Sequence, residues 1–262
     1  MRTYLVVFLK ALKSQMMYRS AILFGTVSSL LTFLIQVSLW SALLGHGVKN
    51  GTSLSEMVMY LIINSVVLTV TKANISSMIE AAVVDGSVSM LLIRPMSYKY
   101  FLLSSVLGQN ACKVVMNLLP MMAISIFIID FSLLPSIPYF LIFLISVVIG
   151  MLIMFEVTYI VGLLAFWIQR CWFVNWYLSA GLVFFGGTAV PLWFYPRQLN
   201  ILSYFLPFRY ITFEPVNIFI HKTPVDRLWL PIAAGLAWLF LLTIIDRLMW
   251  QQATNRLSVN GG

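Results

Sequence analysis

Charged residues are scarce in this sequence. Only 9% of the 262 residues are charged, whereas 61% are hydrophobic, and the mean hydropathy is +0.97. A soluble domain carries about 25% charged residues, because water has to solvate its surface. The apolar residues also form long continuous runs, which suit helices that need roughly 20 apolar residues to cross a bilayer. A membrane β-barrel would instead show ~10-residue alternating segments, so we expect a helical membrane protein.

Residues and motifs for catalysis are scarce as well. The sequence has no GxxxxGK[ST] loop for a nucleotide phosphate, no HExxH and no GxSxG. The histidines, His46 and His221, lie far apart in sequence, and Cys112 and Cys171 lack the spacing of metal ligands. We therefore expect two free thiols, no metal site, no bound cofactor and no enzymatic activity. Any energy source would be an ion gradient or another subunit.

Six apolar runs are predicted to cross the membrane, which makes the chain an all-α polytopic protein with one transmembrane domain over residues 1–262. Inside lipid, each backbone N–H and C=O must be paired within its own segment, which favours helices. The predicted spans are residues 21–44, 56–82, 101–129, 139–168, 173–190 and 228–249.

The net charge of +8 comes from Lys and Arg residues between the apolar runs, so we interpret them as loop charges and not as a nucleic-acid interface. Cytoplasmic loops carry an excess of Lys and Arg. These residues are more frequent on the side of the N-terminus, which places both termini in the cytoplasm and requires an even number of spans.

Residues 2–18 are predicted to form an amphipathic helix in the headgroup layer, with its cations near anionic lipid. The alternative is a frayed basic tail. Apolar residues recur at helical spacing and share one face. They are Leu5, Phe8, Leu9, Leu12 and Met16, with Arg2, Lys10 and Lys13 off that face.

The segment 83–100 lies between the second and third predicted spans, on the inner side. Asp85 or Ser87 is predicted to cap a short helix there, which ends at Arg94 because the residue before a proline disfavours helix. Such a stiff helix could take up force from a partner; the alternative is a structural turn at the membrane surface. The candidate residues are Asp85, Gly86, Leu91, Leu92, Arg94, Pro95 and Lys99.

The segment 191–227 is broken by five prolines, so it cannot be one helix, yet it is too aromatic for an open loop. We expect two short helices, near 198–206 and 211–220, that dip into the outer side of the membrane or lie on it. A preceding glycine pair allows close backbone approach, and Arg209 is expected to pair with Glu214. The alternative is a plain interfacial belt of aromatic residues. The candidate outer-cap residues are Gly186, Gly187, Pro191, Trp193, Phe194, Pro196, Pro207, Phe208 and Arg209.

These two segments resemble those of the membrane subunit of type-2 ABC exporters (the ABC-2 family), in the bacterial subfamily of short six-span permeases. The inner segment is similar to the pattern G…L.RP through Gly86, Leu91, Leu92, Ile93, Arg94 and Pro95. The outer segment is similar to GG..VPL.F.P…LPF through Gly186, Gly187, Val190, Pro191, Leu192, Phe194, Pro196, Leu206, Pro207 and Phe208.

The resemblance implies that 83–99 is the coupling helix that meets a separate ATPase, that the N-terminal helix touches the same subunit, and that 191–220 is the outer gate. It implies two ATPase subunits that bind ATP and magnesium. It also implies a second permease, a different one by preference or an identical one, with spans two and five at the seam. The location would be the bacterial cytoplasmic membrane, among its lipids. The other functions left open are an ion-coupled secondary carrier and a non-transporting scaffold.

Three charged residues, Lys72, Lys113 and Glu156, fall inside predicted spans at similar depth. A lone charge there costs at least ~2.5–3.5 kcal/mol. We expect Glu156 to pair with Lys113 or Lys72 inside the bundle. The rival hypothesis is that Lys72 faces the dimer seam and meets an anionic group of the substrate.

Overall fold

The computed structural model describes residues 2–17, 19–45, 52–93, 95–125 and 134–260. Its regular elements in these ranges are all helical, as predicted. In chain order they are α1 (Arg2–Met17), α2 (Arg19–Gly45), α3 (Leu54–Thr71), α4 (Ile75–Val84), α5 (Val88–Leu92), α6 (Tyr98–Ser125), α7 (Ile137–Leu163), α8 (Ala165–Ile168), α9 (Trp172–Phe185), η2 (Leu192–Phe194), α10 (Arg197–Tyr204), α11 (Phe208–Ile211), α12 (Phe213–Phe219), η3 (Val225–Arg227) and α13 (Trp229–Asn260).

Four segments in the described part of the chain are long and apolar enough to cross a membrane, judged by length and composition. They are Ile22–Leu44, Leu54–Val84, Ile137–Ile168 and Val225–Asn255, and they match the predicted spans one, two, four and six. The other two predicted spans correspond to α6 and α9 and do not meet these criteria. The 14 residues of α9 reach about 21 Å, less than the ~30 Å hydrocarbon core. The count of six spans therefore stays a prediction.

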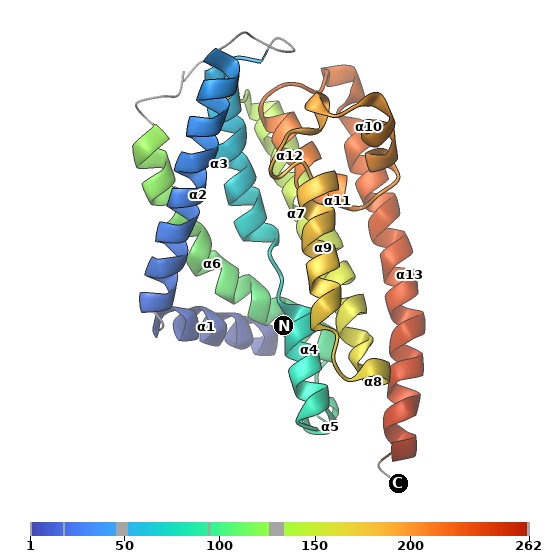
Figure 1. Cartoon of the computed structure of the whole chain (residues 1–262). Coiled ribbons are helices and arrows are strands. Elements are labelled where there is room, and N and C mark those ends of the chain that lie inside the picture. Colours follow the sequence, from blue (N-terminus) through green and yellow to red (C-terminus); the bar gives the residue numbers. More distant parts are fainter. Residues whose placement is uncertain (1, 18, 46–51, 94, 126–133, 261–262) are drawn as a thin grey trace.

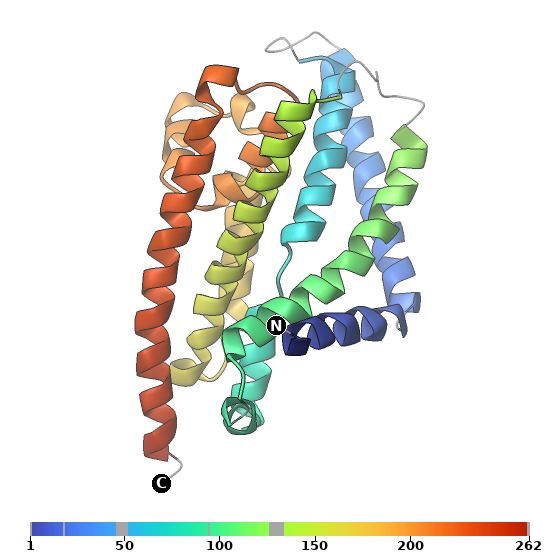
Figure 2. The same cartoon turned by 180° about the vertical axis from the view of Figure 1, so that it is seen from behind.

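The helices are arranged between two distinct ends (Figure 1). The α4–α5 hairpin lies toward one end, with α1 and the last turns of α13 in the same half of the molecule, whereas α10, α11 and α12 lie in the opposite half. Figure 2 shows the same separation from behind. We call these halves the inner half and the outer half.

The predicted amphipathic helix is present as α1, which lies across the inner end of α2 (Figure 1). One part of its predicted apolar face lies against α6, and another part is exposed. Phe8 and Leu12 lie against Gly108 of α6, where a side chain larger than hydrogen would collide with the α1 backbone. Leu5 and Met16 remain exposed. The exposed part suits the lipid contact expected of an interfacial helix.

Local sequence signals explain where several helices begin. A capping box starts α3: the Glu56 N–H donates to the Ser53 hydroxyl (3.2 Å), and the Ser53 N–H donates to the Glu56 carboxylate (3.3 Å). A proline lies in the first turn of α7, where its missing N–H costs no helical bond.

The core has an inner and an outer part, and α7 contributes to both. The outer part includes Phe143 of α7 together with Tyr60 and Phe213, and the inner part includes Ile153 of α7 together with Ile79. Since α7 contacts α3, α4, α11, α12 and α13, it is the central helix of the described bundle.

The second predicted span is not one continuous helix. It is interrupted at residues 72–74, between α3 and α4. The buried Asn110 amide of α6 donates to the carbonyl oxygens of Val70 (3.0 Å) and Lys72 (2.6 Å). A side chain from another helix thus satisfies carbonyls that the interruption leaves without helical partners, which an apolar environment requires.

Candidate functional site

The inner hairpin turns at Asp85 and Gly86, as the sequence motif suggests. Gly86 has a φ of +75°, in the left-handed region that favours glycine. Asp85 accepts a hydrogen bond from the Ser87 N–H (2.9 Å), and bonds from the side chain and backbone of Ser87 lower the pKa of the Asp85 carboxyl. The predicted short helix follows as α5. Ser87 makes no side-chain cap bond to it, so that part of the capping prediction is wrong.

The tip of the hairpin is apolar and exposed. Met90 is 70% exposed and Ile93 is 84% exposed. Pro95 is exposed as well. Two further predicted coupling residues, Leu91 and Leu92, lie in α5 with side chains outside the described part, and Arg94 lies outside the described residues.

Helix α4 is attached to α7 and α9 by specific contacts. The Ser76 hydroxyl donates to the side-chain oxygen of Asn175 in α9 (2.6 Å), and the buried Cys171 thiol lies 3.2 Å from the Glu80 carboxylate. On α7, a Cβ at Gly162 would lie 2.6 Å from Ile79, so only glycine allows this approach of α4. The hairpin therefore cannot shift without displacing α9 or breaking these contacts. Both cysteines are free thiols, as predicted.

Lys99 points into the bundle instead of lining the hairpin surface. Its amine lies 2.6 Å from Glu156 of α7 and also pairs with Asp246 of α13. The predicted pairing of Glu156 with Lys113 or Lys72 is therefore wrong. Lys113 is 14 positions further along α6, about 21 Å away at 1.5 Å per residue, on the part of α6 that packs against α2 and α3. In the described residues, no group of three His, Cys, Asp or Glu side chains is arranged to hold a metal ion.

The glycine pair after α9 forms a turn that other helices hold in place. Gly187 has a φ of +67°, and its carbonyl accepts a hydrogen bond from the buried Tyr60 hydroxyl of α3 (2.6 Å). The Thr212 hydroxyl donates to the Gly186 carbonyl (2.5 Å). The Asn64 amide donates to the carbonyl of Thr188 (3.1 Å). The outer end of α9 is thus joined both to α3 and to the segment between α11 and α12.

The outer segment folds as short helices close to the predicted positions, with α10 and α12 in place of 198–206 and 211–220 and α11 between them. Arg209 is 4% exposed, and its guanidinium lies 2.5 Å from the Glu214 carboxylate, as predicted. It also donates to Asn200 and Ser203, at 2.8 Å each. Burial raises the pKa of Glu214, and the Arg209 charge opposes that rise.

The other predicted outer-cap residues lie in the same region, packed against the spans. Trp193 meets Tyr60 edge to face at 5.1 Å, and Phe194 lies 5.0 Å from Trp40 of α2. Phe208 packs on Gly181 of α9. The prolines Pro191, Pro196 and Pro207 immediately precede η2, α10 and α11. These aromatic residues thus contact the bundle itself, which an exposed interfacial belt would not do.

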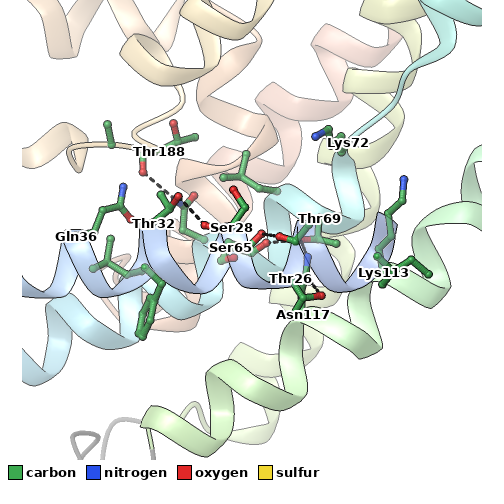
Figure 3. Close-up of a pocket in the computed structure, with 18 of the residues that line it drawn as sticks. Thr26, Ser28, Thr32, Gln36, Ser65, Thr69, Lys72, Lys113, Asn117 and Thr188 are labelled. Atoms are coloured by element: carbon green, nitrogen blue, oxygen red, sulfur yellow. Dashed lines mark hydrogen bonds between the residues drawn. The ribbon is translucent and has the colours of Figure 1, made fainter. Parts of the chain in front are cut away.

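A polar cavity of about 760 Å³ lies between α2, α3, α6 and the turn after α9 (Figure 3). Lys72 and Lys113 lie at one end of it and Gln36 at the other. Its walls combine hydroxyl and amide side chains with a few apolar ones. The lining residues are Gln15, Ile22, Gly25, Thr26, Ser28, Ser29, Thr32, Phe33, Gln36, Leu61, Asn64, Ser65, Leu68, Thr69, Lys72, Lys113, Asn117, Val183, Thr188 and Ala189.

Comparison with models of protein families identifies the family of this chain. A family model described as "ABC-2 family transporter protein" matches residues 26–261. This chain belongs to the ABC-2 transporter family. It is an integral membrane protein with the permease role in an ABC transporter, and ABC-2 membrane proteins generally work with ATPase subunits. No curated protein matches the chain.

Sequence reasoning on this ABC-2 permease identified the two lysines of the cavity but missed its polar wall. In α2, the polar residues Thr26, Ser29, Thr32 and Gln36 recur every three or four positions in an otherwise apolar span. That spacing places them along one side of a helix. A polar stripe in a membrane span was therefore the available signal for a cavity or helix contact on that side.

Proposed function

We propose that this chain is the transmembrane subunit of an ATP-driven exporter in the bacterial cytoplasmic membrane, with both termini in the cytoplasm. It would perform no chemistry and bind no cofactor, and two separate ATPase subunits would bind ATP and magnesium. The observation that carries the proposal is the position of the α4–α5 hairpin, at the end of the bundle opposite the α10–α12 cap (Figure 1). A device that takes up force on one side and opens on the other needs this separation.

Helix α9 would transmit the movement. At its inner end, Ser76 and Glu80 of α4 contact Asn175 and Cys171. At its outer end, the glycine turn is bonded to Thr212, between α11 and α12. Closure of the ATPases would push α5, shift α4 and α9 together, and open the outer cap. Asp85, Gly86 and Pro95 would shape the coupling surface, and Lys99 would hold α6, α7 and α13 together behind it.

A second permease would complete the pathway, a different chain by preference over a second copy of this one. Helix α9 has no buried residue, and its Trp176 and Tyr177 are each 73% exposed. A helix this short that presents aromatic side chains is better suited to a protein seam than to an isolated crossing, because its length falls short of the hydrocarbon core.

Co-expression of this chain with a candidate ABC ATPase subunit, followed by co-purification, tests the proposal. Ile93→Glu and Arg94→Glu place acidic charge on the coupling segment, and we expect each to abolish ATPase binding and ATP-driven transport while the permease still elutes as one species. Leu199→Glu is the matched control, because Leu199 is 43% exposed on α10, at the opposite end; it should leave ATPase binding intact. If both coupling variants keep ATPase binding and transport, the coupling assignment is wrong.

A further inference from the structure

The charge of the polar cavity is one-sided. Lys72 and Lys113 both line it, and its lining residues include no Asp or Glu. Neither lysine makes an ion pair within the described residues, whereas Lys99, Arg209 and Lys222 each pair with a carboxylate. Lys72 is exposed and Lys113 is half-buried, but both lie within predicted membrane spans, where an uncompensated charge is costly. Two charges of the same sign also repel each other. An anion between them would relieve both costs.

The rest of the wall offers hydrogen bonds to a polar ligand. Asn117 joins the Thr26 and Thr69 hydroxyls across α2, α3 and α6 (3.1 and 3.3 Å), which holds these side chains in place. Asn64 is 3% exposed, and its side-chain oxygen has no hydrogen-bond partner. A buried acceptor without a partner is unfavourable. Because this oxygen has almost no accessible surface, a ligand hydroxyl would reach it only after a small shift of the surrounding side chains.

The position of the cavity favours a membrane amphiphile over a dissolved anion. Gln15 of α1 lines it, so it extends to the helix that we expect to lie in the inner headgroup layer. The lysines lie at its inner end, since Gln36, further toward the outer end of α2, marks the other extreme (Figure 3). The wall also includes Ile22 and Leu68, which suit the apolar part of such a molecule.

We propose that this cavity binds an anionic amphiphile of the inner leaflet, with its phosphate or carboxylate between Lys72 and Lys113 and its hydroxyl-bearing part against Thr26, Asn64 and Asn117. This inference rests on the proposed transport function in one respect: the bound amphiphile represents the class of molecule that is transported. Binding itself requires no ATPase. Loss of ATPase binding in the hairpin variants and loss of lipid binding in the cavity variants are therefore separate results.

The test measures lipid binding to the purified full-length chain in a neutral detergent. Fluorescent phosphatidylglycerol and phosphatidylcholine with the same acyl chains are compared. Both lipids carry a phosphate, but the choline cation of phosphatidylcholine offsets that charge and is repelled by the two lysines. We therefore expect the anionic lipid to bind about tenfold more tightly, a difference of 1.4 kcal/mol. Lys72→Gln/Lys113→Gln should remove that preference. Lys113→Glu, which supplies Lys72 with a partner, should remove it in a folded protein.

The matched control is Arg170→Gln/Arg197→Gln, which removes the same charge from exposed positions outside both the cavity and α1 and should change the affinity less than about twofold. Lys72→Arg/Lys113→Arg should retain the preference. Equal binding of the two lipids, or equal losses in the control and the cavity variant, would overturn the proposal. Displacement of the lipid by inorganic phosphate at equal concentration would show a site for free anions and overturn the amphiphile assignment.

Discussion

At the scale of single residues, Gly187 shows what the glycine pair does. Its φ of +67° lies in the left-handed region, and an added Cβ would lie 2.9 Å from both the Phe213 ring and the Tyr60 hydroxyl. Backbone conformation and space both exclude a side chain here. The neighbouring Gly186 has an ordinary φ of −91°, and only the space around it is restricted.

Gly187→Ala is expected to destabilise the protein by about 2–4 kcal/mol, because left-handed backbone costs roughly 1–2 kcal/mol and overpacking adds a similar amount. Equilibrium unfolding in mixed micelles would measure this loss. Gly25→Ala is the control, since nothing lies within 4 Å of an added Cβ in that helix. A loss no larger than that of the control would contradict the assigned role of the turn.

Arg209→Met is expected to cost about 3–5 kcal/mol at neutral pH, because it leaves the buried Glu214 carboxylate without its partner. Removing Arg209 also removes the charge that lowers the pKa of Glu214, so that pKa rises further above its unfolded value. The folded state then binds a proton more readily than the unfolded state. The deficit should therefore be largest above the folded pKa and shrink as the pH falls through it.

Unfolding curves for Arg209→Met at several pH values provide the measurement. Arg209→Met/Glu214→Gln should be more stable than the single variant and show less pH dependence, since it has no buried carboxylate at this site. Arg197→Met, at an exposed position of α10, should lie within about 0.5 kcal/mol of the parent protein. A deficit in Arg209→Met that grows on acidification would refute the explanation.

At the scale of elements, the interruption between α3 and α4 depends on α6. The Asn110 amide is the observed donor to the carbonyls of Val70 and Lys72. Because this side chain reaches the interruption from a different helix, the α3–α4 joint is a feature of tertiary packing. A joint at this position also separates the hairpin from the outer part of the same predicted span.

Asn110→Leu is expected to destabilise the protein by about 2–4 kcal/mol, since two carbonyls lose their donor and each unsatisfied group costs about 1–3 kcal/mol. Amide exchange around residues 72–76 should accelerate. The adjacent Gln109→Leu removes only a long contact to Ser105 (3.4 Å) within the same helix and should have little effect. Unchanged stability and exchange in Asn110→Leu would mean that the amide does not support the joint.

At the scale of the whole molecule, the two ends should face different compartments. In a variant with both cysteines replaced by alanine, we expect Leu199→Cys on α10 to react with a membrane-impermeant maleimide in intact cells. Met90→Cys on α5 and Gln252→Cys on α13, both exposed positions, should react only after permeabilisation. Reaction of the Met90→Cys and Gln252→Cys variants from opposite sides of the membrane would contradict the proposed topology.

Much of the architecture follows from local sequence. Apolar runs predict helices because backbone N–H and C=O groups must hydrogen-bond to each other in lipid. Four of the predicted spans appear as expected. The amphipathic period of residues 2–18 gives α1, and prolines divide the outer segment where α10 and α11 begin. Arg209 and Glu214 are only five positions apart, so their pairing is close to a local property.

Tertiary structure alone decided which distant residues meet. Equal depth suggested that Glu156 pairs with Lys113 or Lys72, but Glu156 lies at the level of Lys99, about 21 Å along α6 from Lys113. The α3–α4 interruption and the cavity likewise depend on where α6 crosses α2 and α3. The sequence by itself determined the helices, the membrane class and the two motifs, because these depend on composition and near-neighbour spacing. The ion-pair partners, the joint and the polar cavity depend on packing between helices far apart in the chain.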